Sequence, residues 1–141
     1  MTHILEKRQY GPDSSPEERE AIRAMVYMHR SDVLYWKEVP VMSVWQVEQF
    51  KEKIDELTEE LDEFSILIDL TNSKPPDART RAALRNVFTP LGLHGMKRAA
   101  AFTGKNFFIN VAAKFVLGGS GLKFSVHSTQ EAAEKALARN D

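Results

Sequence analysis

The sequence predicts a single α/β domain whose sheet contains a parallel component. The chain has 141 residues, which is enough for one domain with a real hydrophobic core. Apolar residues make up 43% and charged residues 28%, as in ordinary globular proteins. From residue 64 onward, apolar strand-like runs alternate three times with helix-like segments, which is typical of an α/β sheet. We find no internal repeat or low-complexity tract, so residues 1–141 are read as one unit.

The N-terminal part begins with an alternating segment at residues 4–10, which ends at a Gly-Pro pair and predicts a first strand. A helix start follows, with Ser15 as the N-cap, Pro16 as the first helical residue and Glu18 as the capping-box acid. The apolar residues in 16–29 fit either a helix or a strand. The cap favours a helix.

The central part is predicted to contain a strand and a long helix. Residues 32–39 are rich in β-branched and aromatic side chains, and Pro40 breaks that strand. Ser43 can cap a helix that runs to about residue 62. Its apolar residues recur every three or four positions, at Val47, Phe50, Ile54, Leu57 and Leu61. This spacing predicts one helix face lying on a sheet, because barely two heptads are too few for a coiled coil.

The C-terminal half carries the strand–helix alternation. The run "FSILIDL" predicts a buried central strand, and Asp77 can cap the helix after the loop "TNSKPPD". Ser128 or Thr129 can cap the last helix. The predicted elements after the first strand of this half are a helix at 78–88, a strand at 97–104, an apolar helix at 106–117, a strand at 122–128 and a helix at 130–139.

Composition excludes several classes of function. The net charge is −1, from 19 Lys+Arg and 20 Asp+Glu, so no global field attracts nucleic acid. The chain has no cysteine, which excludes thiolate chemistry and Cys-ligated zinc. Its four histidines show no metal-site spacing, so we expect neither a metal nor a cofactor. The chain lacks a signal-peptide pattern and a membrane-spanning run, and a cytoplasmic location is expected.

The motifs do not predict an enzyme. The stretch "AAAFTGKN" departs from a phosphate-binding P-loop at Ala99 and at Asn106, although Lys105 and nearby backbone N–H groups could hold an anion. The chain contains no G-x-S-x-G elbow for a serine nucleophile. An unrecognised enzyme is therefore the third reading, behind two binding functions.

The stretch "ILIDLTNSKPPDARTRAAL" resembles the STAS domain, and more specifically the SpoIIAA-like anti-sigma-factor antagonists of bacteria. Asp69 and Asp77 stand eight residues apart around a polar loop, as in that family, and the final strand and "TQEAAEKAL" helix match its ending. The likeness covers residues 64–141. It implies a mixed sheet of about four to five strands, helices mainly on one face, and a regulatory protein-binding role.

The family's phosphorylated motif is altered here. Its serines and glycine are replaced by Ala78, Arg79 and Thr80, so no hydroxyl stands at the phosphoacceptor position. The resemblance then implies a non-enzymatic interaction module, whose partner is another protein or a second copy in a homodimer. The predicted partner-binding residues are Thr71, Ser73, Asp77, Arg79 and Thr80. Three of these are hydroxyls open to modification, although turn and cap hydrogen bonds are their simpler role.

The apolar helix predicted after Lys105 raises a second reading. One of its stripes suits the sheet, but further apolar residues such as Phe107 fall outside that stripe and need a cover. A neighbouring helix, a second subunit, or a lipid, another apolar ligand or a membrane surface would each provide one. The predicted interface or ligand residues are Lys105, Phe107, Phe108, Val111, Lys114 and Phe115.

Overall fold

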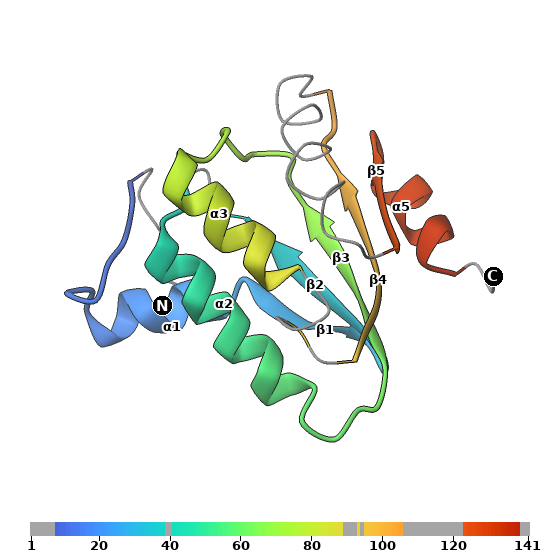
Figure 1. Ribbon diagram of the computed structural model, residues 1–141, viewed down its shortest axis with the longest axis horizontal. Helices are drawn as coiled ribbons and strands as arrows, with labels where there is room; N and C mark the ends of the chain where they lie inside the picture. The colour runs from blue at the N-terminus through green and yellow to red at the C-terminus, as the bar shows by residue number, and fades with distance from the viewer. Residues whose placement is uncertain (1–7, 39–40, 89–92, 94, 106–122, 139–141) are drawn as a thin grey trace.

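The computed structural model of the protein describes residues 8–38, 41–88, 93, 95–105 and 123–138 (Figure 1). These residues form a five-stranded sheet and four helices. The elements, in chain order, are α1 (Pro16–Arg23), β1 (Val26–Arg30), β2 (Val33–Lys37), α2 (Val44–Leu57), β3 (Phe64–Asp69), α3 (Ala78–Val87), β4 (Met96–Phe102), β5 (Lys123–His127) and α5 (Gln130–Leu137).

The strands follow their sequence order across the sheet, from β1 to β5. β1 and β2 form an antiparallel pair, and every later pair is parallel. The mixed α/β sheet expected from the sequence is therefore confirmed. Because β2, β3, β4 and β5 are parallel, their carboxyl ends meet at one edge of the sheet and their amino ends at the opposite edge.

The helices form two layers of unequal size (Figure 1). α1, α2 and α3 cover one face, where their side chains join alternate strand residues such as Trp36, Ile66 and Ile68 in the larger core. α5 covers the other face and packs on the intervening strand residues, including Leu67 and Ala100. Three of the four described helices thus lie on one face, as expected. Trp36 is the centre of the larger core, with its ring 4.9 Å from that of Phe50.

The helix starts agree with the sequence prediction because each is fixed by a local capping bond. Ser15 and Glu18 form the complete capping box of α1. The side chains of Ser43, Asp77 and Thr129 accept hydrogen bonds from backbone N–H groups three residues on, and so cap α2, α3 and α5.

The ambiguous segment at residues 16–29 is neither all helix nor all strand. α1 ends at Arg23, and β1 begins at Val26. The weak preference for a helix is therefore correct only for the first eight residues. The alternation seen in the second half is that of a strand pairing with β2.

The long helix α2 is shorter than predicted. It ends at Leu57, where the Thr58 hydroxyl and backbone N–H both bond to the Ile54 carbonyl. The acidic run that follows would be unfavourable at the negative end of a helix dipole, which explains why the helix does not reach residue 62.

The first strand predicted, at residues 4–10, lies partly outside the described residues, and residues 8–10 do not form a strand. Tyr10 is instead buried against the start of α2, where the Ser43 hydroxyl donates to its carbonyl oxygen at 2.6 Å. The apolar helix predicted at 106–117 also lies outside the described residues. No helix in the described part of the chain has the length and apolar character to cross a membrane.

Candidate functional site at the carboxyl ends of the strands

The loops that follow β2, β3 and β4 gather polar side chains at one edge of the sheet. Glu38 follows β2, Asp69 and Thr71 end β3 and open its loop, and Thr103 follows β4. The carboxyl edge is where open α/β sheets commonly place their binding sites. This edge also carries most of the partner-binding residues predicted from sequence.

Asp69 is fixed by hydrogen bonds at both carboxylate oxygens. The Tyr35 hydroxyl donates to Oδ2 at 2.7 Å. The Thr71 backbone N–H and hydroxyl donate to Oδ1 at 3.0 and 2.7 Å, which makes a tight turn at the start of the loop. Burial, and then this bond to Asp69, raise the pKa of Tyr35, so the phenol keeps its proton and serves as a donor.

Glu38 is a buried carboxyl group beside this network. Burial raises its pKa to about 7, because the charged form loses its hydration. The Ser73 hydroxyl and the Trp36 indole lower the pKa, but they do not offset burial. Glu38 can therefore gain or lose a proton near neutral pH.

Asp77 closes the loop and begins α3. Its Oδ1 accepts the Thr80 backbone N–H at 2.8 Å, and its Oδ2 accepts the Gln9 amide at 2.9 Å. The bond from the Thr80 backbone N–H is the main reason that the pKa of Asp77 lies below its usual range. Gln9 also donates to the Met42 carbonyl, so one side chain ties the N-terminal segment to both α2 and α3.

The residues predicted to bind a partner fall into two groups. Thr71, Asp77 and Arg79 are exposed. Ser73 and Thr80 are only 4% and 1% exposed, so a modifying enzyme cannot reach their hydroxyls in this conformation. The Thr71 hydroxyl is reachable, but it is held by Asp69. The Thr71 hydroxyl thus has a turn role, whereas the buried Thr80 hydroxyl has no hydrogen-bond partner among the described residues.

Lys105 is the one predicted interface or ligand residue that the structure describes, and it is exposed just after β4. The preceding Gly104 has a positive φ of 63°, which favours glycine, and an added Cβ would lie 3.4 Å from Thr71 Cγ2. The end of β4 thus packs against the loop after β3. The other predicted residues, Phe107, Phe108, Val111, Lys114 and Phe115, lie outside the described residues.

A basic surface that was not predicted from the sequence extends from this edge along α3. Lys74, Arg79, Arg81 and Arg85 are exposed, and Asp77 is the one acid between residues 74 and 88. The signal was present in "ARTRAALR", where three arginines occur within one helix. An exposed acidic stretch at residues 59–63 balances this charge in the total, which hides the basic surface from the net charge.

Glu38 was likewise not predicted as a site residue, since its position near the end of a predicted strand gives no sign that it is buried. Within the described ranges, no group of three or more histidine, aspartate or glutamate side chains could hold a metal ion.

No family model, curated protein or solved structure matches the chain. The resemblance to the STAS domain stays a prediction from the sequence pattern.

Proposed function

We propose that the protein is a non-enzymatic interaction module that binds an acidic surface of a protein partner through the loop at residues 71–77 and the start of α3. The observation that carries this proposal is the exposed basic surface of α3 beside a loop that is fixed at both ends. The resemblance to SpoIIAA-like proteins supports the same region, since the corresponding loop and helix carry the regulatory motif of that family.

The loop is suited to binding because little of it has to be ordered on contact. Asp69 fixes its first turn, and Asp77 fixes its last. Pro75 and Pro76 restrict the backbone between them. A surface that is already in its bound shape loses less conformational entropy on association, so more of the contact energy appears as affinity.

The charge of the surface selects the kind of partner. Arg79 and Arg81 project from the first turn of α3, where the helix dipole adds positive potential. Arginine is also common at protein interfaces, where its planar guanidinium group can form two parallel hydrogen bonds to one carboxylate. An acidic partner would approach faster and bind in a defined orientation. The acidic stretch at residues 59–63 of a second copy has the required charge, so a homodimer is one form of this proposal.

The test is affinity capture from an extract of the source cells with the purified protein as bait. We expect the double charge reversal Arg79→Glu/Arg81→Glu to lower recovery of the partner at least about tenfold, as expected for reversed charges in an interface. Lys135→Glu is the matched control, because Lys135 is exposed on α5, on the opposite face of the sheet. Equal recovery by the double variant and the native protein would contradict the proposal.

Self-association is tested separately by sedimentation of the purified protein at low and high salt. A dimer built from the basic surface and the acidic stretch would dissociate at high salt, and Glu59→Lys/Glu60→Lys would also abolish it. Circular dichroism confirms the fold of each variant. Asp77 is retained in all of these variants, because replacing it would remove the cap of α3 as well as a surface charge.

A further inference from the structure

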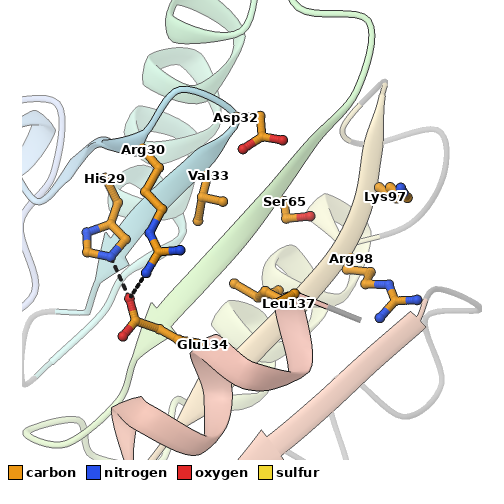
Figure 2. Close-up of a pocket in the computed structure, with 10 residues that line it drawn as sticks. His29, Arg30, Asp32, Val33, Ser65, Lys97, Arg98, Glu134 and Leu137 are labelled. Carbon is orange, nitrogen blue, oxygen red and sulfur yellow. Dashed lines mark hydrogen bonds and ion pairs between the residues drawn. The ribbon is translucent and has the colours of Figure 1, made fainter. Parts of the chain in front are cut away.

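A pocket opens at the amino ends of β2, β3 and β4, on the face that α5 covers (Figure 2). This is the edge of the sheet opposite the loop at residues 71–77. The cavity volume is about 260 Å³, slightly below the usual range for drug-sized ligands, which suits a smaller molecule. The lining residues that matter for binding include Asp32, Val33, Ser65, Lys97, Glu134 and Leu137.

Two β-bulges flank this pocket. β1 and β2 pair Met28 with Leu34 and then Arg30 with Val33, which leaves His29 as the extra residue. β3 and β4 pair Phe64 with Met96 and then Ser65 with Arg98, which leaves Lys97 as the extra residue. Bulges redirect side chains and are frequent beside functional sites. Both extra residues line the pocket.

Ser65 supplies the floor of the pocket. It lies in one row across the sheet, between Val33 of β2 and Arg98 of β4. The residue is 9% exposed, yet its hydroxyl lines the cavity and has no hydrogen-bond partner within the described part of the chain. Because Ser65 lines the pocket, its hydroxyl can donate to or accept from a ligand atom placed there.

Several charges around the pocket are already engaged by the protein. Glu134 of α5 accepts from His29 at 2.7 Å and from Arg30 at 3.2 Å (Figure 2). Arg98 donates to the carbonyl of Ala136 at 3.1 Å. These contacts hold α5 over the sheet and build the wall of the pocket. Because Glu134 is already paired with His29 and Arg30, we do not expect it to be the main ligand-binding group.

The remaining charges lie on opposite sides of Ser65. Figure 2 shows Asp32 on one side, in the turn between β1 and β2, and Lys97 on the other side, on β4. The Asp32 carboxylate has no ion pair or side-chain hydrogen bond among the residues described. Lys97 reaches Glu63 only at 4.0 Å, and its side chain is 53% exposed. Both groups can therefore turn to a ligand.

The strand spacing sets the length of that ligand. Neighbouring strands lie about 4.8 Å apart, so the backbones of β2 and β4 are about 10 Å apart on either side of β3. The side chains of Asp32 and Lys97 fill part of this distance. A molecule with only a few bonds between its own two charged groups can therefore reach both. Val33 and Leu137 supply apolar contact for its middle.

We propose that this pocket binds a small zwitterion, an ω-amino acid whose ammonium group pairs with Asp32, whose carboxylate pairs with Lys97, and which also bonds to the Ser65 hydroxyl. This binding is independent of the proposed protein partner, because it uses the opposite edge of the sheet. A singly charged molecule of the same size would leave one of the two protein charges without its partner.

The experiment is calorimetric titration of the full chain at low salt with ω-amino acids from glycine to 6-aminohexanoate. Butyrate and butylamine serve as singly charged probes that match γ-aminobutyrate in length. We expect at least one ω-amino acid to bind about tenfold more tightly than either singly charged probe, in line with the loss of a charge-assisted hydrogen bond. Asp32→Asn and Lys97→Met should each weaken that binding by about the same factor, and Ser65→Ala by less.

Asp55→Asn and Lys51→Met provide the controls, because this exposed pair on α2 lies on the other face of the sheet. These two variants should bind the ω-amino acid as the native protein does. The proposal is overturned if no ω-amino acid binds the folded native protein. It is also overturned if butyrate or butylamine binds as tightly as the best ω-amino acid, or if the Asp32 and Lys97 variants bind without loss.

Discussion

Glu38 shows how one buried side chain makes the stability of the whole fold depend on pH. Its pKa is about 7 in the folded protein, against 4.5 for an ordinary glutamate. Between these values the folded protein keeps a proton that the unfolded chain has released. The free energy of unfolding therefore decreases as pH rises through this window, and it stays low above pH 7. The shift sets an upper limit of about 3 kcal/mol on the loss.

Glu38→Gln removes this charge and keeps the shape of the side chain. We expect the variant to be more stable than the native protein at pH 8, by up to about 3 kcal/mol, and nearly equal to it at pH 4.5. Urea unfolding at the two pH values measures the difference. Glu48→Gln, at an exposed site on α2, is the control and should show no such dependence. A stability gain that is the same at both pH values would refute the role of Glu38 ionisation.

At the scale of the elements, the sequence was most informative where one short segment decides the structure. Ser15, Ser43 and Asp77 were recognised as caps because a cap bond joins residues only three apart. The two bulges were not recognised, because the register of His29 or Lys97 depends on a partner strand elsewhere in the chain. The burial of Glu38 was missed for the same reason: it is set by tertiary neighbours.

The Ser43 hydroxyl makes two hydrogen bonds at the start of α2. It accepts the Gln46 N–H at 3.2 Å as the cap, and it donates to the Tyr10 carbonyl at 2.6 Å. We expect Ser43→Ala to cost about 2 kcal/mol, since it removes both bonds from a buried site. Thr129→Ala removes only the exposed cap of α5 and should cost at most about 1 kcal/mol. Urea unfolding compares the two, and equal losses would show that the Tyr10 bond contributes nothing.

At the scale of the molecule, the sheet separates two cores of unequal size. The larger core joins α1, α2 and α3 to one face, and the smaller joins α5 to the other. The alternation from residue 64 predicted the parallel part of this sheet correctly. It could not show which face each helix would cover, because both faces of a central strand such as β3 are apolar.

This division predicts that α5 can be released without loss of the main fold. Ala133 is fully buried in the smaller core, so Ala133→Asp would bury a charge beneath α5. We expect backbone amides of α5 to exchange with solvent much faster in this variant, while those of α2 and β3 remain protected. Hydrogen exchange measured by mass spectrometry distinguishes the two regions. Exchange that rises equally in all three elements would mean that the two cores unfold as one unit.

Strand β3 has a further consequence for how the molecule could carry a signal. Ser65 lies near one end of the strand, in the floor of the pocket, and Asp69 lies at the other end, at the start of the loop. Only four residue steps separate them, or about 13 Å of extended chain. A small molecule and a protein could therefore occupy the two ends together without touching. An influence of one on the other has a direct route along this buried strand, and thermodynamics requires that influence to be mutual.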